Sequence, residues 1–369
     1  MKHILMITND TTFAYNLRRE VIQRLLQEGY KVTLAGQVLL FREEFAAMGC
    51  ELVDIPTARQ GTSLTQDLKL FFRYRKVLRK CKPDLVLTNN IKPNVYAGMG
   101  CRLRRIPYIP NITGLGTAVE HPGPLQKLTT RLYKWGVKKA KTILFQNTEN
   151  QEFFESRKMI SKHSKVVLLP GSGVNLEAHP AFPYPADDGK IHFLFVARIL
   201  KEKGIDLYLA AAKRIRQNHP NAVFHICGGC DDQKYIEILK EAQDRQDVIY
   251  HGNQKDMVPF FTMAHCLVHP SYYPEGMSNV LLEAAASARP IIATDRSGCR
   301  ETVDDGVSGY CIPIQNEDAL VEALEKILSL SWEQRRDMGL AGRKKMEKEF
   351  DRQIVVDIYM QEIRRILGN

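Results

Sequence analysis

No stretch of this sequence is apolar for long enough to cross a bilayer, which takes about 20 consecutive and predominantly apolar residues. The apolar run at the start, MKHILMIT, is interrupted by Asn9 and Asp10 and is too short for the core of a secretory signal. We therefore expect this run to be a buried first strand and the protein to be cytoplasmic.

The sequence also lacks a glycine-rich turn after this first strand. The turn there is Asn9-Asp10-Thr11-Thr12, with no G-x-G-x-x-G. Without glycines, such a turn does not bring the backbone close to a pyrophosphate, as a dinucleotide-binding fold requires. This argues against an enzyme that uses NAD or FAD, and we expect no cofactor.

The eight cysteines have no regular spacing and do not predict a disulfide framework. Cys227-Gly-Gly-Cys230 matches a redox pair or half of a zinc site, with Cys266 and His269 as a candidate other half. However, Cys227 ends an apolar run and Cys266 begins one, where small buried hydrophobic residues are typical. We favour packing over a metal or redox role. No DxD-type carboxylate pair follows a strand, so we expect no metal site.

The formal net charge is +10. A nucleic-acid-binding protein is one explanation, but the chain has no basic sheet interleaved with aromatics and no recognition motif. The basic residues gather instead in helices of the first half: Arg73, Arg75, Lys76, Arg79, Lys80 and Lys82; Arg102, Arg104 and Arg105; Lys127, Arg131, Lys134, Lys138, Lys139 and Lys141.

The first of these basic helices is amphipathic, with apolar residues at helical spacing: Leu64, Leu68, Phe71, Phe72 and Leu78. A basic face with an apolar edge suits an anionic membrane surface. A solvated basic back behind a core-facing stripe fits the pattern equally well. Peripheral contact with the inner face of the cytoplasmic membrane is therefore an expectation with an open alternative.

Short apolar runs alternate with helical patterns along the whole chain, which predicts parallel α/β sheets. At 369 residues two domains are expected. The expected strands are 2–8, 31–35, 51–55, 84–89, 108–113, 142–147 and 165–170 in the first half, and 191–197, 222–228, 248–252, 266–271, 290–294 and 310–313 in the second.

A proline-rich polar stretch around Pro180, Pro183 and Pro185 separates the halves and has the composition of a linker. We place a first domain at 1–175, a linker at 176–190 and a second domain at 191–350. The amphipathic tail 351–369 is expected to be a helix.

The stretch Pro270–Glu283, PSYYPEGMSNVLLE, predicts a loop followed by a helix with Ser278 as its N-cap. Glu275 and Glu283 lie eight residues apart, roughly 10 Å at the helical rise. An anion against the helix N-terminus, with hydroxyl groups held by an acid on each side, describes a nucleoside-diphosphate sugar. Two solvated surface acids are the alternative.

A second charged loop, Arg198 to Gly204, follows the expected strand 191–197. A guanidinium and the ammonium of Lys203, five residues apart and ending in glycine before a helix, suit a diphosphate clamp. A plain charged loop is the alternative. Polar groups also follow strand ends of the first half, at Asn9, in 88–94 with Lys92, and in 111–116.

These motifs resemble family four of the retaining glycosyltransferases with the GT-B fold. The resemblance rests on E-x7-E with EG before it, on R-x4-KG, on GSGVN at 171–175 and on KPN and NITGLG, in the family's order across nearly the whole chain. It implies two Rossmann-like doubly wound domains facing across a cleft, with the last helix returning to the first. The chain departs from the family at Thr113, Asn175 and Ala288, where relatives often have histidine, an acid and glycine.

The resemblance also implies the activity. A hexose or N-acetylhexosamine would pass from a UDP-sugar, which is a substrate, to a hydroxyl of a polyprenyl-diphosphate-linked saccharide in capsule, O-antigen or glycan assembly. Arg198, Lys203 and Glu275 are the expected catalytic residues. Expected donor contacts are Gly173, Gly228, Gly252, Asn253, Glu275, Gly276, Met277, Ser278, Asn279 and Glu283. Expected acceptor contacts are Asn9, Lys92, Asn94, Thr113, Gly114 and Gly116.

Three alternatives stay open at this point. A nucleotide-sugar epimerase shares the fold, although E-x7-E together with R-x4-KG points away from it. A basic nucleic-acid-binding protein would bind DNA or RNA with a steep dependence on salt. A non-catalytic sugar-binding module is the third, and the full set of charged donor residues argues against it.

Overall fold

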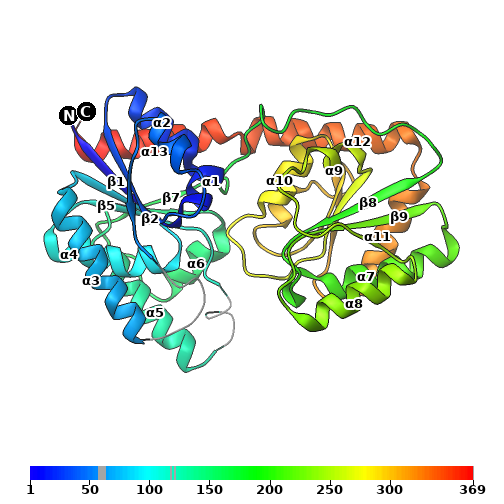
Figure 1. The fold of residues 1–369 in the computed structure, drawn as a ribbon, viewed down its shortest axis with the longest axis horizontal. Helices are drawn as coiled ribbons and strands as arrows, with labels where there is room; N and C mark the ends of the chain where they lie inside the picture. The colour runs from blue at the N-terminus through cyan, green and yellow to red at the C-terminus, as the bar shows by residue number, and fades with distance from the viewer. Residues whose placement is uncertain (57–63, 117–118, 120–121, 369) are drawn as a thin grey trace. The chain divides into compact units, whose positions relative to one another are not determined.

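The computed structural model describes residues 1–56, 64–116, 119 and 122–368, which form two compact units (Figure 1). The first unit comprises Met1–Gly173, Glu275–Met277 and Arg352–Asn369. The second comprises Val174–Pro274 and Ser278–Asp351. Each unit is built around its own parallel sheet.

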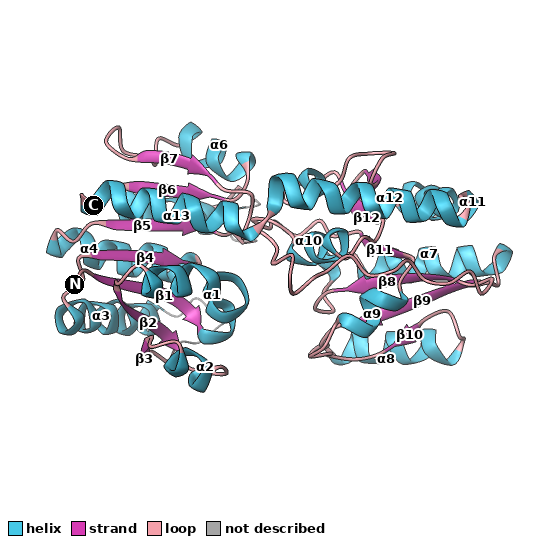
Figure 2. Ribbon diagram, turned by 90° about the horizontal axis from the view of Figure 1, so that it is seen from above, coloured by secondary structure: helices cyan, strands magenta, loops and turns pink. Residues whose placement is uncertain are grey.

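The first unit holds a seven-stranded sheet in the order β3-β2-β1-β4-β5-β6-β7 (Figure 2). All its strand pairs are parallel, which confirms the prediction from the alternating pattern. The strands are β1 (His3–Asp10), β2 (Lys31–Gln37), β3 (Glu51–Asp54), β4 (Leu85–Asn89), β5 (Tyr108–Ile112), β6 (Thr142–Phe145) and β7 (Lys165–Leu168).

Helices cover both faces of this sheet because its strands are apolar on both sides. In β1, Ile4 and Met6 belong to one core cluster, and Leu5 and Ile7 to the other. The helices are α1 (Thr11–Gln27), α2 (Arg42–Ala47), α3 (Leu64–Cys81), α4 (Gly98–Arg104), α5 (Pro124–Val137), α6 (Thr148–Ser156) and α13 (Arg352–Leu367), with a π-helical turn η1 (Pro93–Ala97) before α4.

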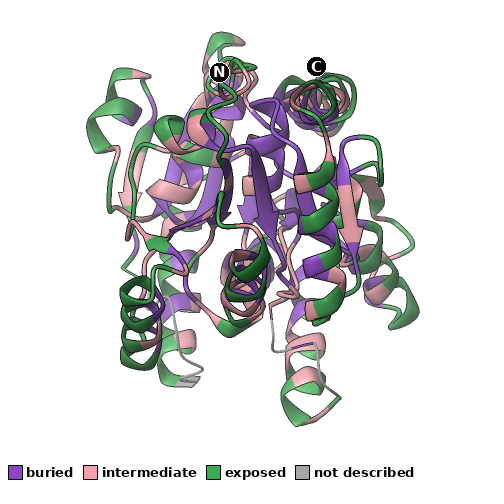
Figure 3. Ribbon diagram, turned by 90° about the vertical axis from the view of Figure 1, so that its right-hand side faces the viewer, coloured by how far each residue is buried: buried purple, intermediate pink, exposed green. Residues whose placement is uncertain are grey.

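The second unit holds a six-stranded parallel sheet in the order β10-β9-β8-β11-β12-β13. Buried strands again lie inside helices with exposed outer faces (Figure 3). The strands are β8 (Ile191–Val196), β9 (Ala222–Cys227), β10 (Ile249–Tyr250), β11 (Cys266–His269), β12 (Ile291–Thr294) and β13 (Gly309–Ile312). The α-helices are α7 (Ile205–Asn218), α8 (Gln233–Asp244), α9 (Val258–Met263), α10 (Asn279–Ala286), α11 (Glu317–Ser329) and α12 (Trp332–Lys345). Shorter turns are η3 (Lys201–Lys203), η4 (Arg300–Thr302) and η5 (Met346–Phe350).

The last helix, α13, packs on the first unit, as the resemblance implied. The hydroxyl of Tyr359 accepts a hydrogen bond from the side-chain amide of Asn111 in β5, at 2.7 Å. Arg352, at the start of the helix, pairs with Glu20 of α1 at 3.1 Å, and both side chains are largely buried. Apolar residues of α13 join the core cluster that α1 also covers.

The proline-rich stretch expected to be a linker is bound to the second unit. The buried Arg289 donates to the carbonyl oxygen of Pro183 at 2.8 Å, and the Trp332 indole donates to that of Pro185 at 2.7 Å. The hydroxyl of Tyr184 donates to the carbonyl oxygen of His265. Its backbone is thus held in place although its composition is that of a loop.

Candidate functional site

Loops at the carboxyl edge of the second sheet form the candidate donor site. The chain runs from β8 outward through β9 to β10, then returns to place β11 on the other side of β8. Such a switch in direction leaves a crevice at the carboxyl ends of the two central strands, where open α/β sheets bind ligands. The loops that follow β8 and β11 are Arg198–Gly204 and Pro270–Ser278, the two motifs singled out in the sequence.

These two loops contact each other directly. The carbonyl oxygen of Glu202 accepts the backbone N–H of Tyr272 at 2.9 Å. The ammonium of Lys203 lies 4.8 Å from the centre of the Tyr273 ring, a cation–π contact. Gly204 has a φ of +79°, and a Cβ there would overlap the carbonyl oxygen of Pro270. The glycine that ends R-x4-KG therefore permits this close approach.

Arg198 and Lys203, the predicted phosphate ligands, differ in exposure. Arg198 is exposed, directly beyond the end of β8, and Lys203 is partly buried beneath the aromatic ring. The backbone between them is fixed because Ile199 donates its N–H to the carbonyl oxygen of Gly229 at 2.9 Å. Both cations thus lie on a segment held at the switch point.

Helix α10 begins at Asn279, so Ser278 is its N-cap residue as predicted. The predicted capping bond is wrong, however. The Ser278 hydroxyl lies 3.1 Å from Nε2 of His269 at the end of β11, and its side chain makes no capping bond to the helix. The first turn of α10 therefore has N–H groups without a side-chain cap, an arrangement that favours an anion.

The estimate of roughly 10 Å between Glu275 and Glu283 is also wrong in its basis, since it assumed the helical rise throughout. Only the part from Asn279 onward is helical. Glu283 lies in the second turn of α10 and is partly buried. Glu275 precedes the helix and groups with the first unit.

Three predicted donor contacts, Gly228, Gly252 and Asn253, follow strands β9 and β10. Gly228 directly follows β9, and its N–H donates to the carbonyl oxygen of Gly252 at 2.8 Å. The hydroxyl of Tyr250 donates to the carbonyl oxygen of Gly228, also at 2.8 Å. Asn253 is exposed beside this pair of loops. The structure thus brings Gly228, Gly252 and Asn253 together at the carboxyl edge of the second sheet.

Three predicted donor residues, Glu275–Met277, belong to the first unit rather than the second. The side-chain amide of Asn147 donates to the carbonyl oxygens of Glu275 and Gly276, at 3.0 and 2.6 Å. A Cβ on Gly276 would lie 2.5 Å from Oε1 of Gln146 and 2.7 Å from the carbonyl oxygen of Thr113. The sequence placed these residues in the second domain because they are contiguous with it.

Gly173, another predicted donor contact, lies in the first unit and bonds to other residues of that unit. Its carbonyl oxygen accepts from the guanidinium of Arg352 at 2.9 Å, and its N–H donates to the carbonyl oxygen of Pro170 at 3.1 Å. Gly173 therefore anchors the start of α13.

The first sheet has a switch point of its own, between β1 and β4. Asn9 follows the core of β1, and its N–H donates to the side-chain oxygen of Asn90 at the end of β4, at 3.1 Å. Lys92 lies 3.2 Å from a carboxylate oxygen of Asp67 in α3. From the sequence we expected Lys92 to be either solvated or a phosphate ligand. The ion pair with Asp67 was not predicted.

The remaining predicted acceptor residues separate into two kinds. Asn94 is fully buried, and its amide accepts from the Thr88 hydroxyl and donates to the carbonyl oxygen of Asn111, both at 2.7 Å. It therefore fixes the strand ends from inside. Thr113, Gly114 and Gly116 are partly exposed at the end of β5.

Sequence reasoning missed the residues that support these loops, namely Gln146, Asn147, Asp67 and His269. Asn147 offered one signal, since it follows a strand and precedes Thr148-Glu149, a pattern typical of an N-cap. Its side-chain oxygen does cap α6, accepting from the N–H of Asn150 at 2.8 Å.

The surroundings of Cys227-Gly-Gly-Cys230 do not favour a redox or zinc-binding role for this motif. Burial raises the pKa of the Cys227 thiol to about 12 and raises that of Cys266 further, so both stay protonated at neutral pH. Within the described residues, no group of three or more His, Cys, Asp or Glu side chains is placed to hold a metal ion.

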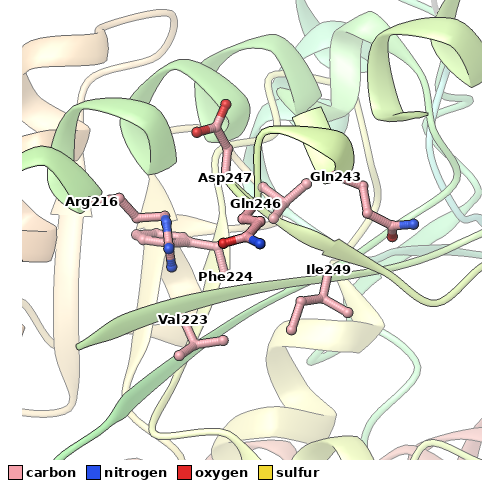
Figure 4. Close-up of a pocket in the computed structure, with 8 residues that line it drawn as sticks. Arg216, Val223, Phe224, Gln243, Gln246, Asp247 and Ile249 are labelled. Atoms are coloured by element: carbon pink, nitrogen blue, oxygen red, sulfur yellow. The ribbon is translucent and has the colours of Figure 1, made fainter. Parts of the chain in front are cut away.

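A pocket of about 300 Å³ lies elsewhere in the second unit (Figure 4). Phe224, near the start of β9, and Ile249, at the start of β10, line it together with Arg216 and Gln246. It thus lies at the amino edge of the sheet, opposite the loops described above. Because parallel sheets bind ligands at their carboxyl edge, we assign the donor site to the loops.

Two glycosyltransferase families match the chain. Residues 3–147 match the family described as glycosyl transferase 4-like, and residues 181–345 match glycosyl transferases group 1. Together the matches span most of the sequence, in the order that the GT-B fold requires. The chain belongs to the family four glycosyltransferases.

Two relatives of this glycosyltransferase have names that include a diphosphoundecaprenol-linked sugar. It is 24% identical, over 96% of both chains, to the N,N'-diacetylbacillosaminyl-diphospho-undecaprenol alpha-1,3-N-acetylgalactosaminyltransferase of Campylobacter jejuni. It is 26% identical to the UDP-Gal:alpha-D-GlcNAc-diphosphoundecaprenol alpha-1,3-galactosyltransferase of Escherichia coli, over 74% of this chain and 73% of the relative.

Solved structures bear out the GT-B fold. Sucrose-phosphate synthase from Thermosynechococcus elongatus superposes with a TM-score of 0.79 at 19% identity, over 100% of both chains. Anabaena HepE, solved in complex with UDP and glucose, gives a TM-score of 0.77 at 15% identity, over 98% of this chain and 99% of that one.

Proposed function

We propose that this glycosyltransferase moves a hexose or N-acetylhexosamine from a UDP-sugar to a hydroxyl of a polyprenyl-diphosphate-linked saccharide, with retention at the anomeric carbon. The observation that carries the donor assignment is the switch point of the second sheet. Arg198, Lys203 and the uncapped start of α10 all follow strands β8 and β11 there.

The chemical task at this point is to stabilise a leaving diphosphate. As the glycosidic bond to the donor phosphate breaks, negative charge grows on the phosphate oxygens. A guanidinium, an ammonium and a helix N-terminus oppose that charge without needing to reorganise. Arg198 suits bidentate contact with phosphate oxygens, and Lys203 acts as a point charge.

The acceptor hydroxyl attacks on the same face of the sugar from which the diphosphate departs, and its proton passes to that phosphate. Glu283, partly buried in α10, holds ribose hydroxyls, and Glu275 holds hydroxyls of the transferred sugar. Side-chain cations carry the charge that a metal ion would otherwise carry, so the proposed reaction is metal-independent. This proposal is supported by the relative positions of the cations and α10 within the second unit.

An acceptor embedded in a membrane requires the protein to reach the bilayer surface. None of the helices that the structure describes combines the length and apolar character needed to cross a bilayer. Helices α3, α4 and α5 pack beside one another in the first unit and expose large apolar side chains: Leu68 at 56%, Phe72 at 53%, Leu103, Leu125, Leu128 and Trp135 at 55%.

These apolar side chains alternate with lysines and arginines of the same helices, such as Lys69, Arg102 and Lys134. The predicted core-facing stripe of α3 is only partly core: Leu78 is buried, whereas Leu68 and Phe72 are exposed. Exposed aromatic and aliphatic groups beside cations suit the interface of an anionic membrane. We therefore propose that this face of the first unit touches the cytoplasmic leaflet.

A nucleotide-sugar panel tests the donor proposal. Thermal stabilisation of the full chain should be largest with UDP and UDP-sugars, because binding to the native state raises the melting temperature. The best donor is then assayed with a polyprenyl-diphosphate saccharide, and the anomeric configuration of the product is read by NMR. Inversion at that carbon, or an epimerised nucleotide sugar in place of a glycoside, would contradict the proposal.

Vesicles test the membrane proposal separately. The protein should sediment with vesicles containing anionic phospholipid and remain in solution with purely zwitterionic ones. The double variant Phe72→Asp and Trp135→Asp should lose this binding while keeping its affinity for UDP. Equal sedimentation of wild type and variant would reject the assignment of this face.

A further inference from the structure

Three histidines on adjacent strands of the second sheet form a hydrogen-bonded row, which we call the histidine chain: His192 in β8, His225 in β9 and His251 directly after β10. Nδ1 of His192 lies 2.9 Å from Nε2 of His225, and Nδ1 of His225 lies 3.0 Å from Nε2 of His251. The ring centres are 5.1 and 5.2 Å apart. Each ring therefore bonds to the next through a nitrogen pair.

A fourth histidine, His265, contacts His192 but makes no ring-to-ring hydrogen bond with it. Nδ1 of His265 accepts the backbone N–H of His192 at 3.1 Å, and the two rings stack with centres 5.6 Å apart. A backbone N–H can only donate, so Nδ1 of His265 is the acceptor and carries no proton. The proton of the neutral ring is therefore on Nε2. The exchangeable protons of the ring-to-ring bonds thus belong to the other three histidines alone.

The proton capacity of the histidine chain follows from counting nitrogens. Three imidazoles have six ring nitrogens, four of which face one another in two hydrogen bonds, and each bond holds one proton. Three neutral rings carry three protons: two in the bonds and one at either end. A fourth proton fills the other end and leaves both bonds intact. A fifth would place two N–H groups face to face and break a bond.

The surroundings decide where the fourth proton resides. His225, in the middle, is 4% exposed, and burial together with its two imidazole neighbours lowers its pKa to about 3. The outer rings are partly exposed. Asp188 and Lys190 act on His192 with opposite signs, and the Phe260 ring lies 4.9 Å from that of His251. Burial lowers the pKa of both outer rings, and at His192 the carboxylate of Asp188 opposes this lowering while Lys190 adds to it.

Two further cations limit the capacity of this region. Arg335 of α12 and Arg289, which follows α10, oppose a positive charge on His265, whose pKa burial lowers to about 4. His265 is therefore counted apart from the three rings of the histidine chain.

The histidine chain adjoins Gly252 and Asn253, two of the predicted donor contacts. His251 directly precedes Gly252 and Asn253, and Gly252 accepts the backbone N–H of Gly228 at 2.8 Å. Strand β10 spans only Ile249–Tyr250 and is an edge strand, paired with β9 alone. The bond from His225 to His251 is the side-chain link of this edge, beside the backbone bond from the His251 N–H to the carbonyl oxygen of Ile226 at 2.9 Å.

We propose that the histidine chain binds one proton as a single unit, and that its bond from His225 to His251 holds Gly252 and Asn253 in position for the donor. The second clause rests on the proposed function, whereas the first does not. Donor affinity should stay constant while the first proton binds, since both bonds survive. It should fall when a second proton breaks the bond between His225 and His251.

The decisive experiment on the first clause is a pH titration of the full chain followed by side-chain ¹⁵N NMR of its histidines. The expected result is one shared midpoint for His192, His225 and His251, with total uptake of one proton before any ring-to-ring bond is lost. Three separate midpoints, or unfolding before any uptake, would overturn the proposal.

Variants and UDP titration test the second clause. In His225→Phe both bonds are lost, and affinity for UDP at pH 8 should fall about fivefold to tenfold, the effect of one net hydrogen bond. His192→Phe keeps the bond between His225 and His251 and should bind UDP like wild type. His163→Phe, at an exposed loop histidine, is the matched control.

The outcomes distinguish the uptake of one proton by the histidine chain from the positioning of Gly252 and Asn253. Should His225→Phe fold and bind UDP as tightly as wild type, the positioning role is rejected. Should His225→Phe not fold, His251→Phe removes the same bond to His225 and takes its place. UDP affinity equal to that of wild type would then reject the positioning role, and a loss of about fivefold to tenfold would support it. Absence of UDP binding by wild type, together with a shared NMR midpoint, would reject the proposed function and leave the one-proton site standing.

Discussion

The two units share one architecture and use their switch points differently. At the switch point of the first sheet, polar side chains are bonded to one another: Asn9 with Asn90, and Lys92 with Asp67. At that of the second sheet, Arg198 is exposed and the start of α10 has no side-chain cap. The same topology thus gives an edge whose polar side chains bond to one another in one unit, and an edge with an exposed guanidinium and an uncapped helix start in the other.

The largest effect is expected when a cation is removed from the switch point of the second sheet. Lys203→Ala should lower kcat about 100-fold to 1,000-fold, the range for losing one electrostatic contact to developing charge. The melting temperature should change little, because the loop backbone is held by Glu202 and Ile199. Initial rates with a confirmed donor check this.

Lys201→Ala is the matched control for that prediction, since Lys201 is an exposed lysine two residues away on the same turn. We expect it to retain most of the activity. Equal losses in the two variants would mean that general positive charge on the loop, rather than the position of Lys203, determines the rate.

The next effect concerns the segment Glu275–Met277, which packs on the first unit. Gly276→Ala should lower the free energy of unfolding by about 1–3 kcal/mol, because the new Cβ would crowd Gln146 and Thr113. Chemical denaturation measures the change. Gly123→Ala, where a Cβ meets no atom within 4 Å, is the control. A Gly276→Ala variant as stable as this control would contradict the packing described.

The two units should also differ in their response to acid. Burial lowers the pKa of His225 to about 3 and of His265 to about 4, both in the second unit. The unfolded chain binds these protons near pH 6.5, so stability is full above that value and is lost as the pH falls toward the folded pKa. Each histidine should contribute up to about 1.4 kcal/mol per pH unit.

Urea denaturation at several pH values between 7.5 and 5 checks the sign of this dependence. His225→Phe should make the loss of stability shallower, and His163→Phe should leave it unchanged. A second unit that becomes more stable on acidification would contradict the burial of neutral imidazoles.

The smallest expected effect is at α13. Tyr359→Phe should destabilise the first unit by about 1 kcal/mol, the net value of one hydrogen bond, because the buried amide of Asn111 loses its acceptor. Tyr15→Phe is the comparison, since Tyr15 is held by stacking on Phe41. If both changes have the same effect, the hydrogen bond to α13 contributes nothing measurable.

Much of the fold could be predicted from the sequence, because apolar runs and turn residues are local signals. The strands of both sheets lie close to where the pattern placed them, and R-x4-KG and the start of α10 follow the neighbouring strands β8 and β11. The return of α13 followed from the resemblance rather than from any local pattern.

The rest depends on partners far apart in the sequence. Lys92 pairs with Asp67, Ser278 contacts His269 instead of capping α10, and Asn147 holds Glu275. The histidine chain arises because β8, β9 and β10 are neighbours and each histidine lies two residues beyond the partner of the previous one: His192 pairs with Val223, and His225 pairs with Ile249. Nothing in the spacing of these residues along the sequence signals such contacts.

The central claim is that the nucleotide binds at the switch point of the second sheet, and a structure with UDP bound tests it most directly. We predict that the diphosphate contacts Arg198, Lys203 and the first turn of α10, with the base beside Gly252 and Asn253. A nucleotide bound at the first sheet's switch point, or in the pocket beside Phe224, would contradict the account.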